Sequence, residues 1–242
     1  MSKVYADAIA TTEASQDLIL GGSGDNVIVT AGATLKTNTV KDSGGNTLWT
    51  SDGSGTLSGV NAAMKGNMVL LSTQTASNAA SVSFTSGIDS TYKLYIFKFY
   101  DVNPATDTQQ LMFNGSIDGG SNYNVTKTTT NFTAYHNEDD SGPTLGYSAG
   151  DDLAQGTGFQ PLTTTIGNGA DESAAGTLWL FNPSNTTYVK HFYSRLNAYQ
   201  AGNYTVEVYA AGYFNDTNDI DAIQFKMSSG NMDSVIKMYG VG

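Results

Sequence analysis

Residues 68–242 contain about ten short apolar segments, separated by turn-forming residues at intervals of about 10–14 residues. The clearest segment, YKLYIFKFYDV at 92–102, alternates from residue to residue and is apolar on both sides, as a central sandwich strand would be. No segment has a convincing helical period. The sequence therefore predicts an all-β fold in which an antiparallel β-sandwich of jelly-roll-like type occupies 68–242. The expected strands are 68–75, 80–86, 92–102, 110–117, 123–137, 176–183, 188–200, 204–214, 220–227 and 234–240.

Residues 1–67 have a different sequence pattern. Their apolar segments are only a few residues long and are interrupted by glycines, as in DLILGGSGDNVIVTAGATLKTNTV. Strands this short are marginal on their own. They become stable if three copies wind around one axis and share an apolar seam, which would also remove exposed strand edges. We therefore expect 1–67 to be an attachment and trimerisation shaft; the alternative is a flexible Gly/Ser linker. The expected seam residues are Leu18, Leu20, Val27, Val29, Leu35, Leu48 and Trp49.

Charge and composition exclude several classes of protein. The net charge is −11 and Arg195 is the only arginine. Nucleic-acid binding needs Lys and Arg to neutralise phosphates, and anionic membranes attract the same residues, so neither partner is expected. The chain has no cysteine and therefore no disulfide to stabilise it. It has no apolar signal region or membrane span either, so we expect a protein made in the cytoplasm without an export signal.

The residues that could carry catalysis are few. Only His136 and His191 could serve a serine nucleophile as base, and no G-x-S-x-G motif is present. The acids between 138 and 172, among them Glu138 and Asp151, could form a glycosidase pair, although such runs are usually solvated. NDTNDID at 215–221 is either an Asx-rich turn or a calcium loop, and the turn is favoured. We expect no catalytic residue, cofactor or metal.

The polar stretch 137–176 is long for a connection in a sandwich, and long loops often carry function. Proteins that bind sugars place exposed aromatic rings beside Asp and Asn side chains. The expected receptor contacts are therefore Tyr147, Asp151, Asp152, Phe159 and Asn168. Trp179, in the apolar segment GTLWLFN, is expected in the core.

Several segments resemble virion structural proteins of tailed bacteriophages, especially marine ones. The most specific are Thr-Ser-Gly-Ile-Asp-Ser-Thr-Tyr at 85–92 and Phe-Lys-Met-Ser-Ser-Gly-Asn at 225–231, within a similarity that covers most of 68–242. GGSGDNVIVTAGATL and SGGNTLWTSDGSGTL, both in 1–67, look like the proximal segments of phage tail fibres. The resemblance implies a homotrimeric, fibre-like or peripheral protein of the virion. It carries over no catalytic residue.

Together these observations predict a non-enzymatic virion component, a tail fibre or adhesin that contributes to attachment at the host surface. Its expected partners are two further copies of itself, other virion proteins through the N-terminal region, and a glycan or protein of the host surface. The first alternative is a capsid decoration protein, either a head fibre or a cement protein. The second is a tailspike enzyme that degrades polysaccharide.

Overall fold

The computed structural model describes residues 39–51, 53–54, 57–58, 60 and 68–242. The chain divides into two units, Met1–Met64 and Lys65–Gly242, where the sequence led us to expect a boundary at 67/68. Five of the expected seam residues lie outside the described residues, namely Leu18, Leu20, Val27, Val29 and Leu35.

The described part of the first unit is a small antiparallel sheet with the order β1-β2-β3. Its strands are β1 (Thr39–Lys41), β2 (Thr47–Ser51) and β3 (Leu57–Ser58). The β1–β2 turn is held by the Asp42 carboxylate, whose Oδ1 accepts hydrogen bonds from the backbone N–H of Gly44 (2.9 Å) and of Asn46 (2.8 Å). The remaining two expected seam residues, Leu48 and Trp49, lie on β2 and are only half-buried.

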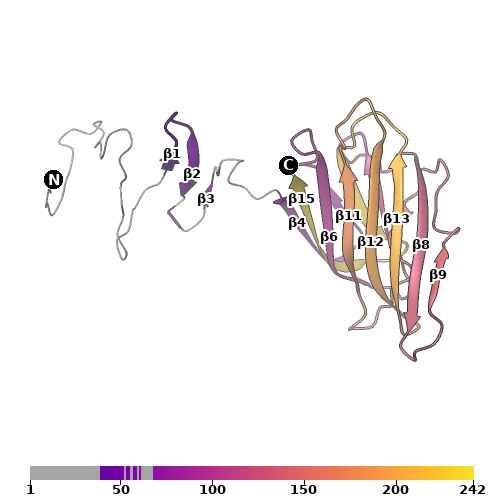
Figure 1. The fold of residues 1–242 in the computed structure, drawn as a ribbon. Coiled ribbons are helices and arrows are strands. Elements are labelled where there is room, and N and C mark those ends of the chain that lie inside the picture. The colour runs from indigo at the N-terminus through magenta and orange to yellow at the C-terminus, as the bar shows by residue number, and fades with distance from the viewer. Residues whose placement is uncertain (1–38, 52, 55–56, 59, 61–67) are drawn as a thin grey trace, which may run out of the picture. The chain divides into compact units, whose positions relative to one another are not determined.

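The second unit is a two-layer antiparallel β-sandwich, which confirms the expected fold class (Figure 1). One sheet has eight strands in the order β4-β15-β6-β11-β12-β13-β8-β9, and the other has four in the order β10-β7-β14-β5. All of the expected strands are present. The strands are β4 (Met68–Ala79), β5 (Val82–Phe84), β6 (Leu94–Pro104), β7 (Leu111–Ser116), β8 (Lys127–Asn137), β9 (Thr144–Tyr147), β10 (Gln160–Pro161), β11 (Ala174–Phe181), β12 (Lys190–Gln200), β13 (Tyr204–Phe214), β14 (Ala222–Met227) and β15 (Met232–Val241).

The core lies between the two sheets, where alternate residues of each strand meet. Phe97 and Phe99 of β6 are almost fully buried. They pack edge-on against Phe225 of β14, in the facing sheet, with ring centroids 5.3 Å and 5.0 Å away. This geometry suits the aromatic quadrupole and adds to the energy of apolar burial. The aromatic cluster therefore joins the two layers of the sandwich.

Trp179 is not in the core, contrary to expectation. Its neighbours Leu178 and Leu180 are fully buried and occupy the inward positions of β11. Because successive strand residues point to opposite faces, Trp179 has to point away from the core. It is half-buried on the outward face, where its ring stacks on Tyr193 of β12 at 4.6 Å.

The stretch 137–176 is not a single long loop, because it contains two short strands. It contributes β9, which pairs with β8 at the edge of the eight-stranded sheet, and β10, which pairs with β7 at the edge of the four-stranded sheet. Both strands are too short for alternation to reveal them in the sequence. The stretch thus supplies an edge strand to each layer.

Candidate functional site

The outward face of the eight-stranded sheet is the side turned away from the four-stranded sheet. On this face, many aromatic side chains lie on the part of the sheet formed by β11, β12, β13, β8 and β9. Two pairs of rings stack across neighbouring strands: Trp179 with Tyr193 at 4.6 Å, and Phe132 of β8 with Tyr209 of β13 at 4.7 Å. Phe132 and Tyr193 are 40% and 44% exposed, so these rings form a surface rather than a second core.

One row of this face crosses several strands in register. Arg195 of β12 lies opposite Tyr209, Tyr209 opposite Phe132, and Phe132 opposite Tyr147 of β9. The Arg195 guanidinium sits 5.4 Å from the Tyr209 ring centroid and donates a hydrogen bond to Glu207. This bond raises the pKa of Arg195 above its ordinary value. The only arginine of the chain is therefore neutralised on its own face.

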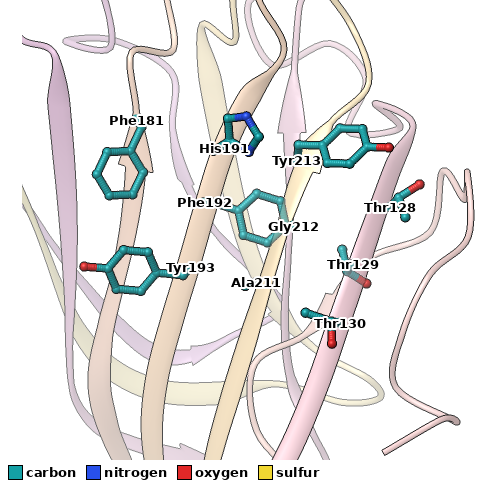
Figure 2. Close-up of a pocket in the computed structure, with 10 residues that line it drawn as sticks. All are labelled: Thr128, Thr129, Thr130, Phe181, His191, Phe192, Tyr193, Ala211, Gly212 and Tyr213. Atoms are coloured by element: carbon teal, nitrogen blue, oxygen red, sulfur yellow. The ribbon is translucent and has the colours of Figure 1, made fainter.

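A shallow open pocket of about 430 Å³ lies next to this row (Figure 2). Its centre is Ala211 of β13, which has Tyr193 opposite it on β12 and Thr130 opposite it on β8. The next outward position of β13 is Tyr213, which makes an edge-on ring contact with His191 at 5.9 Å. We call this pocket the Ala211 recess. It is lined by Thr128, Thr129, Thr130, Phe181, His191, Phe192, Tyr193, Ala211, Gly212 and Tyr213.

The recess exists because one small residue, Ala211, interrupts a row of rings on β13. Residue 212 has to be glycine, because a Cβ there would lie 2.5 Å from the backbone oxygen of Thr128. Gly212 occupies a core-facing position of β13, so the depression on the outward face comes from Ala211, whose single methyl stands between Tyr209 and Tyr213. The lining includes no carboxylate, lysine or arginine. Its polar groups are the hydroxyls of threonine and tyrosine and the imidazole of His191, and the paired carboxyls of a glycosidase are not among them.

The structure does not bring the five expected receptor residues together. Tyr147 donates its hydroxyl hydrogen to Asp152 Oδ2 (2.5 Å), which raises the pKa of Tyr147. Asp151, by contrast, accepts a hydrogen bond from Gln110 (2.9 Å), at the start of β7.

The other two expected contacts lie elsewhere in the sandwich. Phe159 lies under the Lys226 ammonium of β14, with 4.2 Å from Nζ to the ring centroid. Asn168 donates its backbone N–H to Asp107 (3.3 Å). Of the five, Tyr147 is on the same outward face as the recess, and the Asp152 carboxylate contacts its hydroxyl there.

The remaining candidates for catalysis or metal binding are not grouped into a site in the described residues. His136 faces Asp140 at 3.4 Å across exposed side chains. In the part of the chain that the structure describes, neither histidine hydrogen-bonds a serine hydroxyl. At 215–221, Asp216 Oδ1 accepts from the backbone N–H of Asn218 (2.8 Å), as in an Asx turn. Among the described residues, no three His, Asp or Glu side chains could share a metal ion.

Sequence reasoning missed the recess. A usable signal was present, because the alternation of 188–200 and 204–214 places His191, Tyr193 and Tyr213 on the face opposite the buried leucines and valines. No protein-family model, curated protein or solved structure matches this chain. Within the described ranges, no helix is long and apolar enough to cross a bilayer.

Proposed function

We propose that this chain is a non-enzymatic virion component of a tailed bacteriophage, a tail fibre or adhesin that contributes to host-surface attachment. The observation that carries the proposal is the ring-bearing outward face of the eight-stranded sheet, on which Phe132 and Tyr193 are exposed. Contiguous apolar patches on a protein surface mark sites of interaction. The sequence resemblance to phage virion proteins supports the assignment of the chain to a phage particle. The exposed rings support the role in attachment.

The rings on this face are suited to recognition. Stacking on a neighbour fixes the orientation of Trp179, Tyr193, Phe132 and Tyr209, so a partner would lose little additional side-chain entropy when it binds. Tyrosine and tryptophan combine a large apolar surface with a polar handle, which is why they are common at binding interfaces. The face therefore has the character of a preorganised binding surface.

The placement of Glu138 and Asp151, the two acids named above as candidates for a glycosidase pair, supports a binder rather than a polysaccharide hydrolase. Glu138 is exposed, and its backbone N–H is held by the backbone oxygen of Asn203 (3.0 Å), at one end of the long sheet. Asp151 is engaged by Gln110, at the start of a strand of the other sheet. A glycosidase needs two carboxyls facing each other across a sugar groove, and these two carboxyls sit in unrelated surroundings.

The assembly that we propose is a homotrimer, docked on the particle through residues 1–67. The half-buried Leu48 and Trp49 on the small N-terminal sheet support it, because neighbouring chains could complete their burial. A trimer would also present three copies of the outward face. Linked sites gain avidity through effective concentration, so weak individual sites suffice for attachment.

The location of the protein is tested with antibodies raised against 68–242 and labelled with gold, applied to intact phage particles in the electron microscope. We expect label on the tail. Label confined to heads would overturn the proposal in favour of a capsid decoration protein. Release of reducing ends from host polysaccharide by the purified protein would overturn it in favour of a tailspike enzyme.

The attachment role is tested with fluorescently labelled full-length protein and cells of the bacterial host. We expect binding that competes with adsorption of the phage and that falls at least about tenfold in the double variant Phe132→Ser, Tyr193→Ser. The matched control is Tyr188→Ser, at an exposed tyrosine in the loop between β11 and β12. Equal binding by the control and the double variant would show that the outward face does not contribute to attachment.

A further inference from the structure

We infer that the Ala211 recess binds one pyranose ring of a neutral glycan. The inference rests on the proposed attachment function and names its ligand. It differs from the sequence-based expectation, which placed the contacts in 137–176. It is carried by the shape of the recess, the chemistry of its walls and rim, and its lack of charge.

The recess has the dimensions of a site for a single ring. Tyr193 and Thr130 flank Ala211 on the two adjacent strands, so their backbones are about 10 Å apart. Along β13, Tyr209 and Tyr213 bound it with a separation of about 13 Å. The only side chain on the floor between them is the Ala211 methyl, and Gly212 lines the recess with backbone. A six-membered ring fits this opening, whereas a folded polypeptide surface could insert little more than one side chain.

The walls match the apolar side of a sugar. A pyranose presents a face of C–H groups, and such a face packs on an aromatic ring. Tyr193, Phe181 and Tyr213 supply aromatic surface on two sides of the recess (Figure 2). Tyr193 is held in place by its stack on Trp179. The aromatic wall is therefore present before the ligand arrives, which lowers the entropy lost on binding.

The rim matches the polar edge of a sugar. The hydroxyls of Tyr193 and Tyr213 and the imidazole nitrogens of His191 hydrogen-bond to no other group in the described chain. The Thr128 hydroxyl already accepts from the Gln155 side chain at 2.7 Å, which fixes its rotamer. An apolar floor with a few convergent polar groups at the rim is the usual construction of a small-molecule site.

Charge narrows the class of glycan. No lysine or arginine lines the recess, and the nearby Arg195 is already paired with Glu207. The whole chain carries a net charge of −11, which repels polyanions. Uronic acids and sialic acids would therefore find no counter-charge. Neutral hexoses and N-acetylhexosamines are the sugars that suit the site.

A second copy of this chain is the competing occupant of the same surface. A stable protein interface buries about 800 Å² per partner. The recess is one residue wide and has a polar rim, so another sheet would leave its hydroxyls without partners. We therefore favour the sugar, and the experiment below includes a readout for self-association.

The test uses the fluorescence of Trp179, whose ring stacks on the recess wall. The chain has two tryptophans, so Trp49→Phe in the full-length protein leaves Trp179 as the only one. The probes are the methyl glycosides of glucose, galactose, mannose and N-acetylglucosamine, with methyl glucuronide as the anionic comparison. We expect saturable binding of at least one neutral probe, with a Kd of about 1–10 mM, and at least about tenfold weaker binding of the glucuronide.

The decisive variants are a matched pair on the same face. Ala211→Leu fills the recess without removing a ring. Ala175→Leu makes the same change at an exposed outward position of β11, opposite Asn197. We expect at least about tenfold weaker sugar binding in the first variant and unchanged binding in the second. If Ala211→Leu does not fold, the double variant Tyr213→Phe, His191→Ala removes polar groups of the rim and is expected to weaken binding in the same way.

Three outcomes would overturn the inference. The first is no binding of any neutral probe while host-cell attachment persists, which would leave the proposed function standing. The second is equal sugar binding by Ala211→Leu and Ala175→Leu. The third is a change of oligomeric state in Ala211→Leu by light scattering, which would assign the recess to a second copy. Failure of the proposed function itself would appear separately, as loss of host-cell binding by the wild-type protein.

Discussion

Lys127 of β8 and Phe214 of β13 lie opposite each other at one end of the core, with the lysine Nζ 5.7 Å from the ring centroid. Lys127 is fully buried. Its Nζ donates to the backbone oxygens of Val125 (3.1 Å) and Gly158 (2.6 Å), and it forms no ion pair with a carboxylate of the described residues. Burial disfavours the charged form and lowers the pKa of Lys127 to about 7.

The buried lysine predicts that the protein becomes more stable as the pH rises above neutrality. Between a folded pKa of about 7 and an unfolded pKa of about 10.4, the unfolded chain binds more protons at Lys127 than the folded chain. Stability therefore increases with pH in that window. Over pH 7 to 9, we expect a gain of about 2 kcal/mol in the free energy of unfolding from this group. The measurement is urea unfolding at a series of pH values.

The control for this effect is a pair of lysine substitutions. Lys127→Met is expected to abolish the gain, whatever its effect on the absolute stability. Lys93→Met, at an exposed lysine, is expected to retain it. The window stops at pH 9 because of Tyr95, since burial raises the pKa of this tyrosine in the folded chain. Near pH 10 the folded chain therefore holds more protons at Tyr95 than the unfolded chain, and stability falls as the pH rises. A pH profile that is identical in wild type and Lys127→Met would contradict the prediction.

The aromatic cluster predicts a large loss of stability when its central ring is removed. Phe225 touches Phe97 and Phe99 and bridges the two layers of the sandwich. Phe225→Ala leaves a cavity that the rigid sheets cannot close, and we expect a loss of about 3–5 kcal/mol in denaturant unfolding. Phe132→Ala, on the outward face, is the control, with an expected loss of about 1 kcal/mol or less. Similar losses in both variants would mean that the outward face is as packed as the core.

Alternation predicted most of this fold, because it depends only on neighbouring residues. The strand expected at 188–200 is β12, and the buried Phe192 and Leu196 alternate in it with exposed side chains. The prediction for Trp179 was wrong because an aromatic residue in an apolar strand was expected in the core, although the leucines on either side of it take the inward positions. Alternation could have placed Tyr193 on the outward face, but it could not predict the recess itself, since Tyr193, Ala211 and Thr130 meet only through the register of three strands. Register is a property of the folded sheet.

The buried, unpaired amide of Asn131 suggests a substitution that would stabilise the protein. Its side chain is fully buried, and neither its Oδ1 nor its Nδ2 has a hydrogen-bond partner in the described chain. An unsatisfied buried amide costs about 1–3 kcal/mol, so a side chain of similar shape without polar atoms should be preferred. We expect Asn131→Leu to raise the free energy of unfolding by about 1 kcal/mol. Asn124→Leu, at an exposed asparagine whose side chain makes no hydrogen bond in the described chain, is the control, with an expected change within about 0.5 kcal/mol. A loss of stability in Asn131→Leu would indicate that a buried water satisfies the amide.

The N-terminal sheet predicts that assembly depends on residues 1–67. None of the described residues in 1–67 belongs to the buried core, and Trp49 on β2 is only half-buried. The sandwich, in contrast, has its own core between two sheets, so 68–242 is expected to fold alone. By light scattering we expect a trimer for the full chain and a monomer for 68–242. Trp49→Ala should weaken the trimer, whereas Tyr188→Ala, an equally drastic change at an exposed ring of the sandwich, should not. A full chain that stays monomeric at micromolar concentration, or a trimer of 68–242 alone, would show that residues 1–67 do not hold the copies together.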